Sequence, residues 1–452
     1  MKKNFLLLIF TMLLQFATAQ ETEKALAKRQ NIQTKLLEAK VLLEKDNGKL
    51  WGKPIWNDSI IVIDFDSSIY SLANLPNSKT DNDTLHYKTM ERNSLVFVNT
   101  TQKYEGKEYA TVLNNYLDDK SATVIHELFH LLQMKSRKFK GNPIEYLDET
   151  NARILLRLEY QALKNALKAI SEKRKNVEVK NHLKDAVIFR KERQKQYAKC
   201  LNDELEIETL EALANYTGFA LSSYSNKYEK AIEEINDREE AKTYTRPFPY
   251  ATGPAYGLIF DYLDIPWKNG LDKIYNFADI YENMVLKSAL NVNKKGLESA
   301  KLRNNFEEIN RQEIAREKEQ KKLIDYYTDL LFNKPTLKVA ITDIEHYGRT
   351  FNMNGTLTLN DKGIVYSSIK GRDKSGKNFG NFGTIEGKNQ LGKAGILSYE
   401  KEGKTYFVFP LPSKIEGRKI ISEFYEIELN PDWKAVKQND GNMEIVREPE
   451  EH

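Results

Sequence analysis

The stretch ATVIHELFHLL, residues 122–132, constrains the fold more than any other part of the chain. Its only charged residue is Glu127, which lies between His126 and His130. The other neighbours of these three residues are apolar. An apolar run of this length predicts a helix that is buried on most sides. Burying a carboxylate and two imidazoles without partners would cost several kcal/mol. The fold must therefore provide partners for all three side chains.

The spacing of the two histidines suggests what those partners are. Residues four apart lie on one helix face, so His126 and His130 can direct their imidazoles at one point. Neutral imidazoles suit Zn²⁺, and a catalytic zinc site has three protein ligands and one position for water. Glu127 is rotated away from that point but can reach the water as general base. The alternative is a buried helix whose histidines bond to backbone or carboxylates, with Glu127 in a salt bridge.

The segment VIHELFHLL resembles the active-site helix of the zincin metallopeptidases. In the gluzincin branch of that family, the third zinc ligand is a glutamate on a later helix. Beyond the motif, the resemblance is loose and covers the region from about Ser59 to Leu263. It implies a peptidase body in which an edge strand holds the substrate beside the HExxH helix.

Two glutamates are the main candidates for the third ligand. Glu211, in ETLEALANYTG, resembles the E-G-x-A-x-Y type of ligand helix, with Ala212 in place of the usual glycine. Its apolar neighbours would make an unpaired carboxylate costly, and a metal would satisfy it. Glu149, in YLDETNAR, follows His130 by 19 residues, as in several gluzincins, but its polar surroundings favour a helix N-terminus. We favour Glu211. The remaining candidates are Glu208, Glu159 and a histidine or aspartate that the sequence does not identify.

Two tyrosines are further candidates for the site. In RPFPYATGPAYGLIFDYL, residues 246–263, a helix is expected to begin near Pro254, since proline is tolerated in a first turn. Tyr250 would then lie in the loop before that helix, where its hydroxyl could stabilise an oxyanion. Tyr216 lies near Glu211 in the sequence. For both tyrosines, aromatic packing is the simpler interpretation.

The N-terminal residues have the pattern of a secretory signal peptide, which we assign to residues 1–19. Lys2 and Lys3 precede an apolar run from Phe5 to Leu14, and small residues follow at 17–19. The run is too short for a permanent membrane span. We expect an exported protein, periplasmic or secreted, without a membrane span. Because the chain has one cysteine, no internal disulfide can form and the fold must depend on its core.

The composition changes near residue 335, which indicates two domains. Residues 20–335 are mainly helical, with strands expected at 59–65 and 94–100, and residues 141–200 are expected to form a helical insertion between the ligand helices. Thirteen of the 22 glycines lie between 348 and 441, among alternating polar and apolar residues. Residues 336–452 are therefore expected to form an antiparallel β domain. The predicted fold class is α+β, a mainly helical zincin-like body with a small N-terminal sheet.

The charge pattern argues against a nucleic-acid partner. The formal net charge is +4, and the lysine and arginine runs are interleaved with acids rather than concentrated in a basic stripe. The charge-rich segment 171–199 is expected to be a scaffold helix with solvated faces. No glycine-rich phosphate loop stands next to an expected strand, so no nucleotide cofactor is predicted.

Together these features predict an exported zinc-dependent metallohydrolase, a peptidase that acts on a peptide or protein substrate. His126, His130 and Glu211 would hold the Zn²⁺, and Glu127 would activate the attacking water. The alternative is an inactive exported binding protein on a peptidase-like scaffold, whose β-rich tail holds a glycan or a protein partner. The sequence leaves the substrate and the oligomeric state open.

Overall fold

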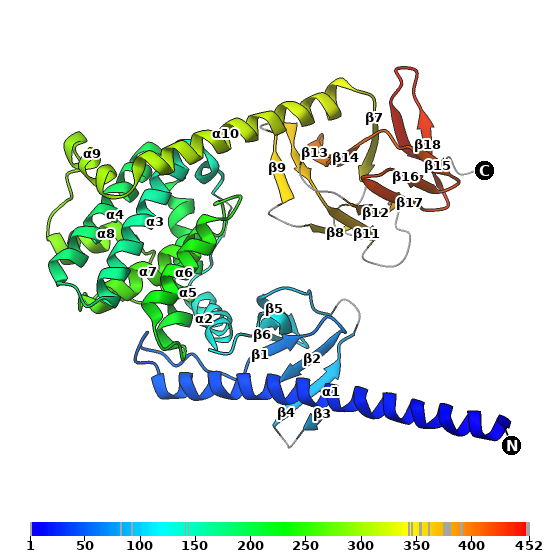
Figure 1. The fold of residues 1–452 in the computed structure, drawn as a ribbon, viewed down its shortest axis with the longest axis horizontal. Coiled ribbons are helices and arrows are strands. Elements are labelled where there is room, and N and C mark those ends of the chain that lie inside the picture. The colour runs from blue at the N-terminus through cyan, green and yellow to red at the C-terminus, as the bar shows by residue number, and fades with distance from the viewer. Residues whose placement is uncertain are drawn as a thin grey trace. The chain divides into compact units, whose positions relative to one another are not determined.

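The computed structural model divides the chain into two compact units, Met1–Asn310 and Arg311–His452 (Figure 1). The first unit is mainly helical with one sheet, and the strands of the second unit follow, so the predicted α+β class is confirmed. The structure describes residues 2–81, 84–91, 94–140, 142, 144–341, 344, 347–351, 355–359, 362–373, 381–388 and 392–448, with the backbone alone for 2–22 and 373.

The described residues form ten α-helices, the last of which continues from the first unit into the second. These are α1 (Lys2–Asp46), α2 (Ala122–Ser136), α3 (Thr150–Ser171), α4 (Asn176–Gln196), α5 (Leu201–Leu221), α6 (Lys227–Glu239), α7 (Phe248–Tyr262), α8 (Phe277–Ile280), α9 (Lys294–Arg303) and α10 (Phe306–Thr328). Among these residues, no helix is both long enough and apolar enough to cross a bilayer.

The sheet of the first unit has the strand order β3-β4-β2-β1-β6-β5, in which only β1 and β6 pair in parallel. Its strands are β1 (Ile60–Ile63), β2 (Ser68–Ser71), β3 (Lys79–Asp81), β4 (Leu85–Thr89), β5 (Thr100–Tyr104) and β6 (Lys107–Leu113). Alternate side chains of β1 point to opposite faces of the sheet and pack into different hydrophobic clusters. Ile60 and Val62 join the core formed with the helices, whereas Ile61 and Ile63 join a smaller cluster on the other face.

The strand expected at 59–65 is present as β1, but the prediction of a strand at 94–100 is wrong. Strand β5 begins only at Thr100, and Val96 and Val98 are exposed. The side chain of Gln102 bonds the backbone of Val96 instead, accepting from its N–H at 2.8 Å and donating to its carbonyl at 2.9 Å. A side-chain amide thus replaces a strand partner, which β propensity alone cannot predict.

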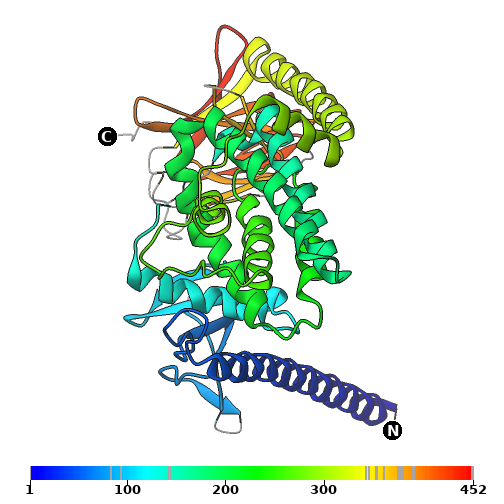
Figure 2. The ribbon, with the colours of Figure 1, turned by 90° about the vertical axis from the view of Figure 1, so that its left-hand side faces the viewer.

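Helices α3 to α7 gather into one bundle in both views (Figures 1 and 2). Helix α5 packs against α7 within this bundle and against α2 outside it. The predicted helical insertion is confirmed, because α3 and α4 fill most of the chain between α2 and α5. Helix α2 also packs against β5 and β6, so it lies between the sheet and α5.

Helix α7 begins earlier than the sequence predicts. It starts at Phe248, with Pro249 in its first turn and Pro254 inside the helix. Proline is tolerated in the first turn because those N–H groups have no helical partner. Pro249 therefore occupies the position expected for Pro254, and Tyr250 lies inside the helix rather than in a loop.

Helix α7 approaches α5 very closely at Gly253. A Cβ atom built on Gly253 would lie 2.1 Å from the carbonyl oxygen of Ala212, which no side chain can tolerate. Gly257, one turn later, would place its Cβ 2.1 Å from the ring of Tyr216. The two glycines thus give α7 a smooth face, which fits against the backbone of α5 at Gly253 and against a ring of α5 at Gly257.

The second unit contains two sheets, with the strand orders β18-β19-β7-β14-β13-β10-β9 and β15-β16-β17-β12-β11-β8. All pairings are antiparallel except that of β19 with β7. A separate hydrophobic core joins residues of both sheets, such as Val339 and Ile427. The strands are β7 (Thr336–Ile341), β8 (Tyr347–Phe351), β9 (Thr356–Thr358), β10 (Ile364–Tyr366), β11 (Ile369–Asp373), β12 (Gly383–Gly387), β13 (Ile396–Lys401), β14 (Lys404–Pro410), β15 (Lys414–Glu416), β16 (Lys419–Ile421), β17 (Tyr425–Leu429), β18 (Trp433–Lys437) and β19 (Met443–Arg447).

The contact at Gly253 can be tested by adding one methyl group. Gly253→Ala should lower the free energy of unfolding by about 1–3 kcal/mol, because the helices must separate to admit the methyl group. Gly296→Ala in α9 is the control, since its Cβ would meet only Asn293 Oδ1 at 3.4 Å. That change should be neutral or stabilising by up to about 1 kcal/mol. Thermal melts compare the variants, and equal melting temperatures would contradict the close contact.

Candidate metal centre

The two histidines of α2 converge as their spacing predicts. His126 and His130 are both buried, and their Nε2 atoms lie 3.0 Å apart. The rings are nearly perpendicular, with centroids 4.7 Å apart. Residues one helical turn apart can reach a common point only if both side chains leave the same face, and these do.

Glu211 of α5 completes a group of three donors. Its Oε2 atom lies 3.6 Å from Nε2 of His126 and 3.5 Å from Nε2 of His130. Two ligands of a tetrahedral zinc ion at bond lengths near 2.0–2.1 Å are about 3.3 Å apart. All three separations are close to that value, so this donor set fits Zn²⁺. The Glu211 side chain is 21% exposed, which leaves the group open to solvent on that side.

The other third-ligand candidates are engaged elsewhere. Glu149 is exposed, occupies the N-cap position of α3 and accepts a 3.0 Å hydrogen bond from the Tyr197 hydroxyl. Glu208 and Glu159 are buried and both bond to Arg190. Among the described residues, the only group of three or more metal-binding side chains is formed by His126, His130 and Glu211.

Gln133 orients His130 and was not singled out from the sequence. The Nδ1 atom of His130 lies 3.0 Å from Gln133 Oε1, an acceptor, so a proton on Nδ1 completes this bond while Nε2 faces the other two donors. The Gln133 amide donates in turn to the carbonyl of Thr209 on α5, at 3.1 Å. Gln133 therefore connects the two helices that carry the donors. Its position three residues after His130, on the same helix face, is the signal that could have identified it.

Glu127 is buried beside the two histidines of α2. Its carboxylate accepts no hydrogen bond from any residue that the structure describes. Burial raises its pKa, with Glu211 acting in the same direction, although the two imidazoles oppose the shift. A carboxylate in this state is free to exchange a proton with a molecule bound at the centre.

The charges of the donor group depend strongly on one another. Burial disfavours the charged form of His130, but the neighbouring Glu211 carboxylate favours it more strongly and raises the His130 pKa to about 9. Burial likewise works against the charge on Glu211, yet the two imidazoles beside it hold the pKa of Glu211 well below its usual range. Glu211 is therefore anionic at neutral pH, as a metal ligand must be.

Of the two candidate tyrosines, only Tyr250 lies at the centre. Its hydroxyl donates to Glu211 Oε2 at 2.7 Å, and its ring is nearly parallel to that of His126, with centroids 5.7 Å apart. Burial, and then the charge of Glu211, raise the Tyr250 pKa well above its usual range. Tyr216 instead bonds Asp261 and packs against Trp267, so it belongs to the core.

A buried network of ion pairs fixes α5 from the side of the insertion. Arg190 donates to Glu159 at 2.7 Å and to both carboxylate oxygens of Glu208, while Arg193 donates to Glu159 and Glu204. All five side chains are at most 1% exposed. The expectation of solvated faces on segment 171–199 is therefore wrong for these two arginines. Each reaches acids that are remote in sequence, which charge patterning cannot reveal.

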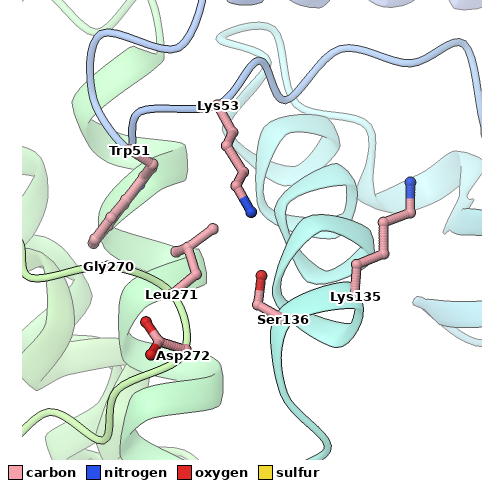
Figure 3. Close-up of a pocket in the computed structure, with 7 residues that line it drawn as sticks. All are labelled: Trp51, Lys53, Lys135, Ser136, Gly270, Leu271 and Asp272. Atoms are coloured by element: carbon pink, nitrogen blue, oxygen red, sulfur yellow. The ribbon is translucent and has the colours of Figure 1, made fainter.

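A pocket beside the C-terminal end of α2 is separate from the centre. Figure 3 shows its lining, in which Lys53 and Ser136 point toward the same space. Its volume is about 360 Å³, and no donor of the centre lines it. The lining residues are Trp51, Lys53, Lys135, Ser136, Gly270, Leu271 and Asp272.

Comparison of the chain with protein-family models, with curated proteins and with solved structures gave no match. The geometry of the centre is therefore the basis for assigning a function.

The bridging position of Gln133 leads to a prediction about metal affinity. Gln133→Ala should weaken Zn²⁺ binding about 10- to 100-fold. The change removes the hydrogen bond that orients the His130 ring and the hydrogen bond that connects α2 to α5. Competition with a chromogenic chelator measures the affinity. Gln161→Ala on α3 is the control, since Gln161 bonds Asn165 of its own helix and lies outside the centre. Equal affinities in all three proteins would refute the orienting role.

The buried network leads to a prediction about stability. Arg190→Ala leaves Glu159 and Glu208 in the interior without that cation, and should lower the free energy of unfolding by about 3–5 kcal/mol. Arg174→Ala, at an exposed pair with Glu172, should change it by less than about 1 kcal/mol. Urea denaturation followed by circular dichroism compares the two variants. Similar losses in both would contradict the argument from burial.

Proposed function

We propose that this protein is an exported zinc-dependent metallohydrolase that cleaves peptide bonds. His126, His130 and Glu211 would hold the metal, with donor separations of 3.0 to 3.6 Å. The observation that carries the proposal is the buried carboxylate of Glu127, which has no hydrogen bond from a described residue and stands beside this donor set. A site that only stored a metal would have no use for such a group.

In this proposal Glu127 performs the proton transfers. When bound, zinc would polarise the scissile carbonyl and make the attacking water more acidic. Glu127 takes a proton from that water and later donates it to the leaving amine. Its raised pKa suits both steps, because a strongly acidic carboxyl would take up the proton poorly.

Tyr250 is suited to bind the negative charge that develops on the carbonyl oxygen. Its raised pKa keeps the hydroxyl protonated, so the group acts as a hydrogen-bond donor. The same hydroxyl donates to Glu211 in the structure at 2.7 Å.

The gluzincin resemblance of VIHELFHLL supports the reaction class, and strand β5 at the sheet edge, packed against α2, suits an extended peptide. Export is the part of the proposal that rests on residues 1–19 alone.

An inactive binding protein built on the same scaffold is the competing function, and it predicts metal binding without hydrolysis.

Glu127→Gln separates the two functions. The change keeps the side-chain volume and removes the base, so Zn²⁺ should stay bound while hydrolysis falls by about 10²- to 10⁴-fold. Metal content is measured by elemental analysis, and hydrolysis with a mixture of internally quenched peptides of randomised sequence. His126→Ala should lose both metal and hydrolysis. Equal rates in wild type and Glu127→Gln would remove Glu127 from the mechanism, and zinc without any wild-type hydrolysis would favour the binding protein.

A further inference from the structure

Helix α7 contains a main-chain carbonyl that its own helix cannot satisfy. In an α-helix the carbonyl of residue 250 would accept from the N–H of residue 254. Residue 254 is Pro254, which has no N–H to donate. The carbonyl of Tyr250 therefore needs a donor from elsewhere, and an unsatisfied carbonyl in the interior is costly.

Asn215 of α5 supplies that donor. Its Nδ2 atom donates to the carbonyl oxygen of Tyr250 at 2.6 Å. Asn215 follows Glu211 by one helical turn, so both side chains leave the same face of α5. The Tyr250 hydroxyl donates to Glu211 at 2.7 Å. Helix α5 thus holds Tyr250 at both ends, at its carbonyl through Asn215 and at its hydroxyl through Glu211.

We propose that Asn215 is a positioning residue of the metal centre, which acts by bonding the Tyr250 carbonyl that Pro254 leaves free. This role rests on the proposed function, since it supports the donor set assigned to zinc. With its backbone fixed, Tyr250 holds the Glu211 oxygen that lies closest to the two histidines. The ligand is then in place before the metal arrives, which lowers the ordering cost of binding.

The close packing of the two helices makes this bond short. Gly253, three residues after Tyr250, lets the backbone of α7 approach Ala212 on α5. The short side chain of asparagine reaches the carbonyl only because the backbones are this close. A proline, a glycine and an asparagine thus contribute to the placement of one hydroxyl group.

A double-mutant cycle tests the proposal through Zn²⁺ affinity, measured by chelator competition. Asn215→Ala and Tyr250→Phe should each weaken binding about tenfold or more, the first by misplacing the tyrosine and the second by removing its hydroxyl. The combined variant should bind no more weakly than Tyr250→Phe, because Asn215 acts through that hydroxyl. Additive losses would overturn the proposal, since they would mean that Asn215 acts by another route.

A second variant tests the role of the carbonyl. Pro254→Ala restores a main-chain N–H that can donate to the Tyr250 carbonyl. Asn215→Ala alone should bind Zn²⁺ about tenfold more weakly than wild type. The double variant Asn215→Ala with Pro254→Ala should bind it within about threefold of wild type. An unrecovered affinity would overturn the role of the free carbonyl. Alanine favours the helix more than asparagine does, so α5 itself is not weakened by Asn215→Ala.

Controls separate this inference from the proposed function. Asn236→Ala on α6 removes an asparagine that bonds Lys164 outside the centre, and should leave Zn²⁺ affinity unchanged. Wild type that binds no Zn²⁺ would overturn the proposed function and this inference together. Wild type that binds Zn²⁺, with Asn215→Ala binding it equally well at the same melting temperature, would overturn the inference alone.

Discussion

The burial of acids along α5 is the constraint on which the rest of the structure depends. Glu204, Glu208 and Glu211 recur at about one-turn spacing along one helix; the first two are buried, and the side chain of Glu211 is 21% exposed. The first two meet guanidinium groups, whose positive charge is permanent. Among the described residues, Glu211 meets only two imidazoles and a hydroxyl. Glu211 is thus the acid of this series without a permanent cation, and a metal ion would complete the pattern.

The helical insertion between α2 and α5 has a physical role in this arrangement. Helices α3 and α4 contribute Glu159, Arg190 and Arg193, which hold α5 by ion pairs in the interior. Such pairs add little net stability, but breaking one is costly, so they penalise any shift of α5 along its axis. From α2, Gln133 bonds the backbone of the same helix at Thr209. The position of Glu211 is therefore fixed from two directions.

Local pattern was enough to predict the α+β fold, the buried helix α2 and the three donors that the structure brings together. His126 and His130 follow from their spacing, and Glu211 from the cost of an acid among apolar neighbours. The burial of Arg190 could not be predicted, because its partners are remote in sequence and a charge-rich segment usually lies in solvent. The predicted start of α7 was wrong for a different reason. Pro249 and Pro254 are both compatible with a first turn, and the local sequence does not decide which of them occupies it.

Ala212 of α5 lies at the closest approach of the partner helix α7. Where two helix backbones approach closely, one of the two facing positions must lack a side chain. Gly253 provides that position on α7, since even a Cβ atom there would collide with the carbonyl of Ala212. The methyl group of alanine therefore does not hold the helices apart. Because Tyr250 lies one turn before this contact, the same close approach brings its hydroxyl to Glu211 and its carbonyl to Asn215.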